Sequence, residues 1–476
     1  MEYTVQKLGP VKDVCIKLRP LTVVCGKNNT GKSYITYSLY TLLEFMKTQL
    51  CDVFDGDKSR SFLQTGECSV NLNDIILRYN LLGKSEELLC KFKETLPRQL
   101  LLEKSTFEES FFNLTLDGKD EELLDKEIKS RHFNFPIKLT SEYTVRFIKR
   151  SGQTILRLIL EPTVQPDIDI VARHEAAKPF LPASGNILKQ IIPLVNIVIS
   201  SFSINNFIIT CERTGVATFR PELSLLRDFV YNAGQDKANR FSDLKSQSEF
   251  KGYSLPIEKE LEFALHIPSL LKRESSDDIV LREIMPFFEE IASGSYVSKD
   301  NTDSVIYYRP LRTDIHLPMS VSSSSVRTLS ELFFYLKFKA KVGQTLMIDE
   351  PELNLHPSAQ RKMARLFARL VNCGINVFIT THSDYLIREL NALMSMSNIP
   401  EHRRSSFLKE HDYQENDLLT RDKVGCYVLD DGVVTEAEYN SAYGFAVESF
   451  DDTILQFNKL YNDLHSLKEE DEDARD

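Results

Sequence analysis

The sequence lacks several features that would place it in a specialised class. No two of its eight cysteines form a C-x-x-C pair: they are Cys15, Cys25, Cys51, Cys68, Cys90, Cys211, Cys373 and Cys426. This spacing excludes a zinc ribbon or a zinc hook, because both use such pairs as ligands. No stretch reaches the ~18 consecutive apolar residues that a membrane span requires. We therefore expect reduced thiols and no membrane contact.

The sequence also lacks an excess of positive charge and a signal peptide. Its 58 lysines and arginines stand against 69 acidic residues, a formal net charge of -11. Broad binding to a nucleic-acid backbone needs a basic face, so nucleic acid is the less favoured partner, although a local basic groove could lie within an acidic total. Residues 1–10 are polar, and the first apolar run is a short strand. We expect a cytoplasmic protein.

The clearest motif that is present is a glycine-containing loop. It reads Gly26-Lys27-Asn28-Asn29-Thr30-Gly31-Lys32-Ser33, directly after the apolar run Leu21 to Cys25 and before a helical pattern. In such a loop the backbone N–H groups surround phosphate oxygens, Lys32 reaches the β- and γ-phosphates, and Ser33 completes a Mg²⁺ shell. The following helix points its positive end at the same phosphates. The motif predicts ATP and Mg²⁺ as cofactors, bound by Gly26, Asn28, Asn29, Thr30, Gly31, Lys32, Ser33 and Tyr34.

Two further apolar strands end in polar residues that suit phosphate chemistry. The run from Thr345 ends in Asp349-Glu350-Pro351-Glu352, which puts Asp349 within reach of the metal shell. Glu350 is then free to take a proton from water that attacks the γ-phosphate. The run from Ile375 ends in Thr381-His382-Ser383. A lone histidine at a strand end is ordinarily a satisfied core residue, but beside these motifs we assign His382 to the site.

Two weaker motifs complete the set. Four serines, Ser322 to Ser325, open an apolar helix, and small residues at a helix N-terminus can form a second anion cradle. Serine clusters are more often simple loops or helix caps. The apolar run from Asn206 ends in Glu212-Arg213-Thr214-Gly215, at a sheet edge where ligands of α/β folds gather. A structural ion pair is an equally favoured interpretation of Glu212 and Arg213.

The order of these motifs resembles the ABC-type ATPase heads of the structural-maintenance (SMC) and DNA-repair group. The most similar members are compact bacterial ATPases paired with effectors in anti-phage defence, as in Septu, retron-associated and PARIS-type systems. Nucleases of the OLD (overcoming lysogenization defect) family share this head. The resemblance covers residues 1–48 and 305–435 and is absent from most of the middle.

The resemblance also implies a role for each motif. Ser33 and Asp349 would hold the metal, Glu350 would be the catalytic base, and His382 would sense the γ-phosphate. Residues 323–327 would be donated across a head-to-head homodimer to the nucleotide of the other subunit. Ser324, Ser325 and Val326 depart from the glycine-rich signature of the family, and no glutamine loop is evident. The additional nucleotide contacts that we expect are Ser323, Ser324, Arg327 and, for part of the glutamine-loop role, Arg213.

The expected fold is α/β: an ABC-type P-loop NTPase with a mixed sheet and flanking helices, plus a mainly helical insertion. With 476 residues, the chain exceeds the size of a single core. Two β-rich runs, Tyr143–Ile148 and Thr154–Leu160, predict a hairpin. The expected division is a head at 1–50 and 300–440 with strands from about 140–215, an insertion at 51–140 and 216–300, and a C-terminal helix with an acidic tail at 441–476.

Three functions are compatible with these motifs. The first is a dimerising ATPase switch that passes its state to a separate effector, a nuclease or toxin, after a phage protein or nucleic acid triggers it. The second is an OLD-like ATP-dependent nuclease. Such a nuclease needs a further domain, and we expect the chain after His382 to be too short for it. A DNA-repair ATPase is a related alternative. The third is a transporter motor, which the D-E-P-E and L-H-P motifs disfavour.

Overall fold

The computed structural model describes most of the chain in separate stretches. The described residues are 1–51, 62, 65–73, 86–116, 118–139, 143–162, 191, 194–195, 198, 204–220, 222–223, 253–271, 279–298, 305–441, 443–447 and 456–464. They belong to two compact units. The smaller unit comprises Met1–Tyr3, Thr41–Thr95 and Phe112–Asn205, and the larger comprises Thr4–Tyr40, Leu96–Phe111 and Asn206–Asp476.

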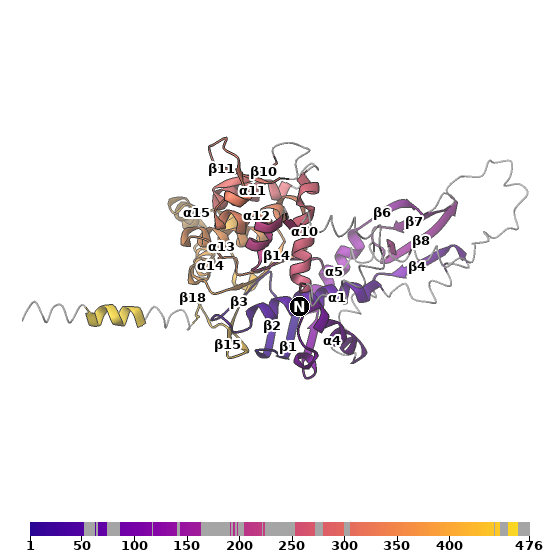
Figure 1. Cartoon of the computed structure of the whole chain (residues 1–476), viewed down its shortest axis with the longest axis horizontal. Helices are drawn as coiled ribbons and strands as arrows, with labels where there is room; N and C mark the ends of the chain where they lie inside the picture. Colours follow the sequence, from indigo (N-terminus) through magenta and orange to yellow (C-terminus); the bar gives the residue numbers. More distant parts are fainter. Residues whose placement is uncertain are drawn as a thin grey trace, which may run out of the picture. The chain divides into compact units, whose positions relative to one another are not determined.

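Most strands of a nine-stranded mixed sheet belong to the larger unit (Figure 1). Its order is β5-β1-β2-β16-β15-β3-β14-β13-β9. The strands are β1 (Glu2–Leu8), β2 (Val11–Lys17), β3 (Leu21–Cys25), β5 (Phe111–Thr115), β9 (Asn206–Ile209), β13 (Thr345–Asp349), β14 (Asn376–Thr381), β15 (Val424–Asp430) and β16 (Val433–Glu436). The central strands β15, β3, β14, β13 and β9 are parallel, whereas β16 runs antiparallel to β15. The expected α/β fold with a mixed sheet is confirmed.

The sequence of each central strand explains its place in the sheet. All five residues of β3 are buried, as are nearly all those of β13 and β14. Parallel strands covered on both faces have such continuous apolar runs.

A two-residue turn lies on the side of β15 that faces away from β3. Asp431-Gly432 joins β15 to β16 there, with φ angles of 44° and 78°. Two consecutive residues with positive φ make the turn type that a two-residue hairpin prefers.

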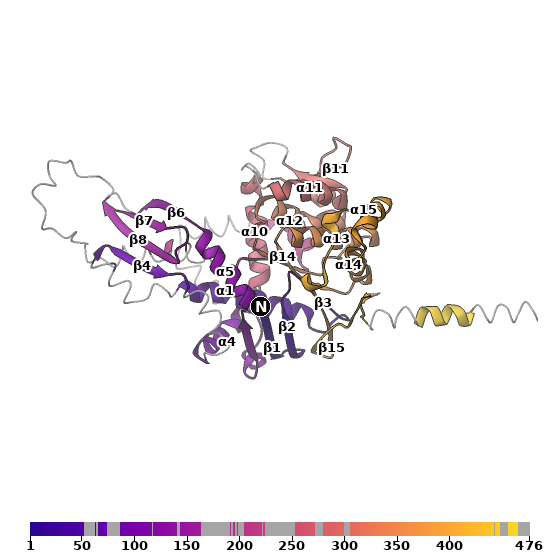
Figure 2. The same ribbon diagram turned by 180° about the vertical axis from the view of Figure 1, so that it is seen from behind.

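The larger unit also contains helices that contribute to its apolar core (Figure 2). They are α10 (Leu255–Leu271), α11 (Ile279–Ala292), α12 (Ser324–Phe338), α13 (Pro357–Asn372), α14 (Asp384–Ser397) and α15 (Glu401–Glu410), and α1 (Lys32–Cys51) begins in this unit. Buried residues of α10 to α14 join those of β3, β13 and β14 in one apolar cluster. A small sheet of β10 (Gly294–Val297), β11 (Tyr307–Pro310) and β12 (Leu317–Pro318) also belongs to this unit.

The smaller unit contains a four-stranded sheet, in the order β4-β8-β7-β6. Its strands are β4 (Glu67–Asn71), β6 (Phe133–Lys138), β7 (Tyr143–Lys149) and β8 (Ile155–Pro162). The predicted hairpin is confirmed, because β7 and β8 pair antiparallel. Helix α5 (Gly118–Ser130) lies in the same unit, and α4 (Glu86–Leu100) begins in it.

Several features of this region differ from expectation. The β7–β8 hairpin belongs to the four-stranded sheet, although we expected its strands in the head: apolar alternation identifies a strand but not the sheet that it joins. Strands β4 and β6, which we did not predict, lie within 51–140. Pro136 weakens the strand pattern of β6, and it is tolerated because β6 is an edge strand.

The C-terminal part is only partly described. Residues 456–464 are helical and exposed, whereas the acidic tail at 469–473 lies outside the described residues. None of the helices in the described part of the chain is long and apolar enough to cross a membrane.

Candidate functional site

Four neighbouring strands deliver the predicted site residues to one edge of the sheet. Strands β3, β14, β13 and β9 are adjacent and parallel, so their carboxyl ends lie at the same edge. The loop 26–33 follows β3, Asp349 ends β13, His382 follows β14, and Arg213 comes shortly after β9. This edge is where ligands of open α/β sheets bind.

The backbone of the loop requires glycine at two positions, 26 and 31. A Cβ atom on Gly26 would lie 2.4 Å from the carbonyl oxygen of Leu429, which is a backbone atom and cannot rotate away. Gly31 has a φ of 106°, which side chains rarely adopt, and a Cβ there would lie 3.1 Å from Pro10. Asn29 also has a positive φ, 62°, in the region that asparagine tolerates best among non-glycine residues. The loop therefore has the conformation of a backbone cradle for phosphate.

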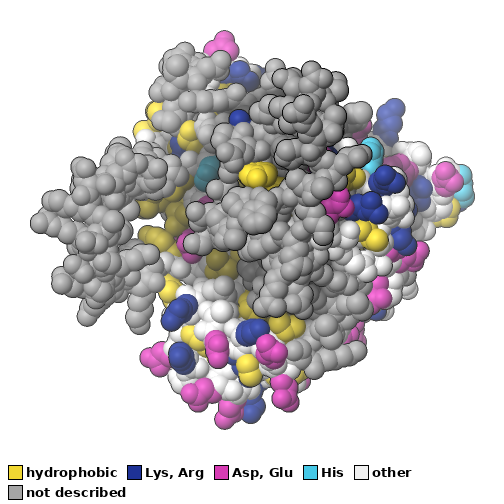
Figure 3. Space-filling model, turned by 90° about the vertical axis from the view of Figure 1, so that its right-hand side faces the viewer, with side chains coloured by type: hydrophobic (Ala, Val, Ile, Leu, Met, Phe, Trp, Pro, Cys, Tyr) yellow, Lys and Arg dark blue, Asp and Glu magenta, His cyan; other side chains and the backbone are white. Residues whose placement is uncertain are grey.

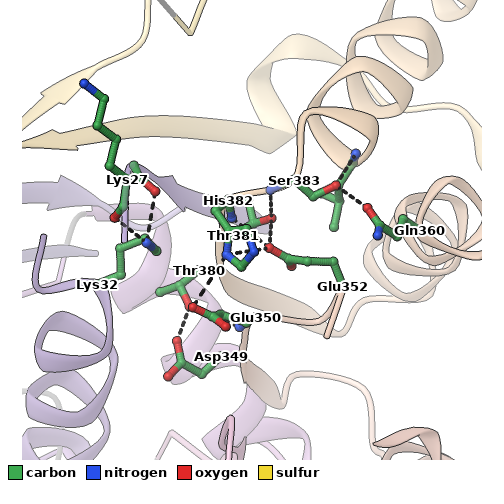
Figure 4. A network of polar contacts seen from close by, with 12 residues as sticks. Lys27, Lys32, Asp349, Glu350, Glu352, Gln360, Thr380, Thr381, His382 and Ser383 are labelled. Atoms are coloured by element: carbon green, nitrogen blue, oxygen red, sulfur yellow. Dashed lines mark hydrogen bonds and ion pairs between the residues drawn. The ribbon is translucent and has the colours of Figure 1, made fainter. Parts of the chain in front are cut away.

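Lys32 begins helix α1 and points back into the loop (Figure 4). Its Nζ atom donates to the carbonyl oxygens of Gly26 at 2.9 Å and Lys27 at 2.8 Å. The side chain is 6% exposed. Thr30 closes the same turn by donating from Oγ1 to the Lys27 carbonyl at 2.9 Å. A cation held by neutral carbonyls in a concave loop suits a phosphate group.

Asp349 has the properties of a metal-supporting carboxylate. It is fully buried, and its Oδ1 atom accepts a hydrogen bond from the Thr380 hydroxyl. Burial raises its pKa, while hydrogen bonds from Thr380 and Ser33 act in the opposite direction. Its Oδ2 atom is buried and makes no hydrogen bond of normal geometry, so it retains an acceptor for a further group.

The two predicted metal ligands, Ser33 and Asp349, thus come together. One hydroxyl, one carboxylate oxygen and the phosphates are the donors that Mg²⁺ takes in nucleotide sites, and the free Oδ2 atom fits that set. Within the described ranges, no group of three or more histidine, cysteine, aspartate or glutamate residues could hold a metal ion by itself.

Glu350 follows Asp349 in a strained backbone conformation. Its φ angle is 50°, in the left-handed region that residues other than glycine seldom enter. Its backbone N–H donates to the Thr380 carbonyl at 3.1 Å, which fixes the turn. The hydrogen bond with His382, followed by nearby positive charge, lowers the pKa of its carboxyl against the effect of burial. Glu350 is therefore ionised at neutral pH, as a general base must be.

His382 lies between two acids (Figure 4). Its Nδ1 atom is 3.6 Å from Oε1 of Glu350 and 3.4 Å from Oε1 of Glu352. The hydrogen bond with Glu350 is the main reason that the pKa of His382 is raised above its usual value. The structure therefore brings His382 to the predicted base.

We did not predict the role of Glu352 from the sequence. Its buried Oε1 atom accepts from the His382 backbone N–H at 2.7 Å and from the Thr381 hydroxyl at 2.8 Å. It thus fixes the turn that carries His382. The available signal was its place in the Asp349-Glu350-Pro351-Glu352 motif, since a second acid so close to a buried strand needs polar partners.

Asn354 is a second residue that sequence reasoning missed. It has a φ of 59°, and its Nδ2 atom donates to Thr328 of α12 at 3.1 Å and to Thr214 at 3.4 Å. The hydroxyl oxygens of Thr214 and Thr328 are 2.8 Å apart. These contacts join the turn after Glu350 to the helix of the serine cluster.

The serine cluster itself is placed at the start of α12. Ser323 is the N-cap and accepts from the backbone N–H of Val326 at 3.4 Å, and both Ser323 and Ser324 are exposed. Arg327 donates from Nη1 to the Ser322 carbonyl at 2.6 Å. No hydrogen bond or ion pair between described residues joins this cluster to the loop 26–33 of the same chain.

Arg213 is buried, and its guanidinium group contacts backbone carbonyls at the end of β13. Its expected contact with a nucleotide stays a prediction.

Comparison with known proteins gives the family. A model of the AAA ATPase domain matches residues 3–182 and 227–387, well over half of the chain. The chain belongs to the AAA ATPase domain family. No curated protein matches it.

Solved structures of SMC heads give only a weak similarity. The head bound to the C-terminal winged-helix domain of ScpA has 12% identity and a TM-score of 0.34, over 91% of this chain and 96% of that one. The Pyrococcus furiosus head with an extended coiled coil, bound to the C-terminal domain of ScpA, has 13% identity and a TM-score of 0.30, over 96% and 98%. The Thermotoga maritima head has 11% identity and a TM-score of 0.28, over 92% and 98%. At these TM-scores the similarity carries no argument.

Proposed function

We propose that this AAA ATPase domain protein binds and hydrolyses ATP with Mg²⁺ as an ABC-type, dimeric switch. The observation that carries the proposal is the convergence of Lys32, Ser33, Asp349, Glu350 and His382 at the ends of three adjacent parallel strands, β3, β14 and β13. Phosphoryl transfer needs little else from a protein than position and charge, and these side chains supply both.

Each residue has a distinct task in this proposal. Lys32 and the N–H groups of its loop bind the phosphates, while Ser33 and Asp349 hold the metal. Bound Mg²⁺ neutralises charge that develops on the phosphate oxygens. Glu350, ionised and 25% exposed, accepts the proton of the attacking water. His382, 40% exposed and favoured in its protonated form, faces the terminal phosphate and holds the Glu350 carboxylate.

We further propose that Ser323, Ser324 and Arg327 complete the site of a second copy of the chain. The hydroxyls of Ser323 and Ser324 are exposed at the N-terminus of a 15-residue helix, where partial positive charge attracts phosphate. These residues have no described contact with the phosphate loop of their own subunit, so they serve the nucleotide only in a homodimer or a larger even-numbered assembly.

Ser323→Asp tests this assignment. Aspartate is as good an N-cap as serine, so α12 stays intact, but its charge repels a phosphate. We expect ATP turnover to fall by at least about tenfold, equivalent to about 1.4 kcal/mol, with unchanged affinity of the single subunit for a fluorescent ATP analogue. Ser405→Asp, which adds the same charge at an exposed position of α15, is the control and should retain full activity. Full activity of Ser323→Asp would contradict the assignment.

We propose that the output of the switch passes to a separate effector, a nuclease or toxin, in bacterial anti-phage defence, with a phage protein or nucleic acid as the trigger. The support is the resemblance of the motifs and the predicted insertion at 51–140 and 216–300, whose sequence shows no catalytic motif and which is long enough to bind a partner. On the face in Figure 3, the coloured basic and acidic side chains lie intermixed. A DNA-repair ATPase and an OLD-like nuclease are the alternatives.

The effector proposal predicts that the pure protein does not cleave nucleic acid. The measurement is incubation with ATP, Mg²⁺ or Mn²⁺ and plasmid, linear DNA or RNA. Cleavage that survives repurification of the wild type and disappears in Lys32→Ala would overturn the proposal and establish the nuclease alternative.

A further inference from the structure

A buried arginine holds the backbone at the two acids of the site. Arg213 is 2% exposed and starts the helical segment 213–220. Its Nη1 atom donates to the carbonyl oxygens of Asp349 at 2.7 Å and Thr210 at 2.8 Å, and its Nη2 atom donates to the carbonyl oxygen of Glu350. The planar guanidinium group of Arg213 therefore fixes the two consecutive peptide groups whose carbonyls belong to Asp349 and Glu350. It also fixes Thr210, directly after β9.

The hydrogen bonds from Arg213 act at Glu350, where the backbone has an unfavourable conformation. Glu350 has a φ of 50°, and such conformations persist only where the surroundings hold them. Hydrogen bonds from a charged donor are about twice as strong as those between neutral groups. The orientation of the Glu350 peptide sets the direction of its side chain, whose Oε1 atom lies 3.6 Å from His382. Arg213 is thus connected to the position of this carboxylate through the backbone.

Two buried acids act electrostatically on the arginine. Glu260 of α10 and Glu331 of α12 are each 1% exposed, and both attract the charge of Arg213. Glu260 also accepts from the backbone N–H of Thr210 at 3.0 Å and from the Thr210 hydroxyl. Burial, followed by the charge of Glu260, raises the pKa of Glu331 well above its usual value, because two adjacent buried carboxyls disfavour double ionisation. The two acids near Arg213 thus come from two different helices, α10 and α12.

We propose that Arg213 is a positioning residue for hydrolysis: it binds the Asp349 and Glu350 carbonyls and thereby aims the Glu350 carboxylate, without contributing to nucleotide affinity. This inference rests on the proposed ATPase function. It gives Arg213 a role inside the protein, different from the nucleotide contact that its place after a strand had suggested.

Arg213→Lys tests the role, because lysine keeps the buried charge between Glu260 and Glu331 but lacks the planar fork that reaches both carbonyls. We expect kcat to fall about 10- to 100-fold, since small displacements of a reacting group have effects of this size. KM and the affinity for a fluorescent ATP analogue should change less than about twofold, because the phosphate loop is untouched.

Arg220→Lys is the matched control. Arg220 lies on the same helical segment, is 8% exposed and is also acted on by the charge of Glu331, but no hydrogen bond between described residues joins it to β13. Its kcat should stay within about twofold of the wild type. An equal loss of kcat in both variants would overturn the positioning role, because general damage to the buried cluster would then explain it.

A double mutant separates positioning from an independent effect. If Arg213 acts through Glu350, adding Arg213→Lys to Glu350→Gln should cause no further loss of turnover, whereas multiplied losses would overturn the proposal. If Arg213→Lys is unstable in thermal unfolding, Arg213→Gln combined with Glu331→Gln removes the guanidinium group together with one of the two adjacent buried carboxyls and carries the same expectation. An active wild type with an equally active Arg213→Lys refutes only this role, whereas a wild type without hydrolysis refutes the proposed function and this role with it.

Discussion

Glu350→Gln should retain ATP binding and slow turnover by at least ~10²-fold, the lower range for loss of a positioned general base. The amide is nearly the same size as the carboxylate but cannot accept the proton of the attacking water. The affinity should persist because the described contacts of the phosphate loop do not involve the Glu350 side chain. Steady-state hydrolysis and equilibrium binding of a fluorescent ATP analogue measure the two quantities. Unchanged turnover in the purified variant would refute the assignment.

The same variant reports on the contact with His382. The hydrogen bond between the two residues lowers the pKa of Glu350 and raises that of His382. The pair stabilises the fold at pH values between these two pKa values: this contribution is lost as the pH rises through the raised pKa of His382, and also as it falls through the lowered pKa of Glu350. In Glu350→Gln, an NMR titration should show a lower pKa for His382 than in the wild type. An unchanged histidine pKa would show that the contact is absent in solution.

Lys32→Ala should weaken ATP binding by about 2–5 kcal/mol, roughly 30-fold or more, the range for truncating one partner of a buried, hydrogen-bonded charge pair. The Nζ atom is the charged group that the loop surrounds, and its present partners are two carbonyl oxygens, Gly26 O and Lys27 O. Equilibrium binding of ATP with Mg²⁺ is the measurement, and ATPase activity should be lost in parallel.

The control for Lys32 is Lys27→Ala in the same loop. Lys27 is exposed, and its described role is to offer its backbone carbonyl, which alanine retains. Removal of the Lys27 side chain should weaken ATP binding only slightly. Equal losses for both variants would indicate a general electrostatic effect of the loop instead of a specific phosphate contact by Lys32.

The residues at the strand ends could be predicted from the sequence because their signal is local. An apolar run followed by polar residues marks the end of a buried strand, and parallel strands gather their ends at one edge. Gly26, Lys32, Asp349, Glu350 and His382 all have this signal, and the structure places each at the end of β3, β13 or β14 or shortly after it. The α/β class and the mixed sheet could be predicted for the same reason.

The remaining contacts of the site depend on turns and on packing that no local pattern shows. The left-handed conformations of Glu350 and Asn354 decide where the following side chains point. Arg213 meets the Asp349 and Glu350 carbonyls only because β9 lies next to β13. Glu260 belongs to α10, far away in the sequence, and its place beside Thr210 is a tertiary contact. Such contacts become visible only in the folded chain.

If ATP joins two copies of this chain and hydrolysis separates them, the bound nucleotide should set the mass of the assembly. The most direct test is the mass of Glu350→Gln by light scattering, with ATP and Mg²⁺ and, separately, with ADP and Mg²⁺. Because this variant binds ATP but hydrolyses it slowly, the closed state should accumulate. We expect at least twice the mass of one chain with ATP and a shift towards the smaller species with ADP. The mass of a single chain with both nucleotides would refute nucleotide-dependent dimerisation.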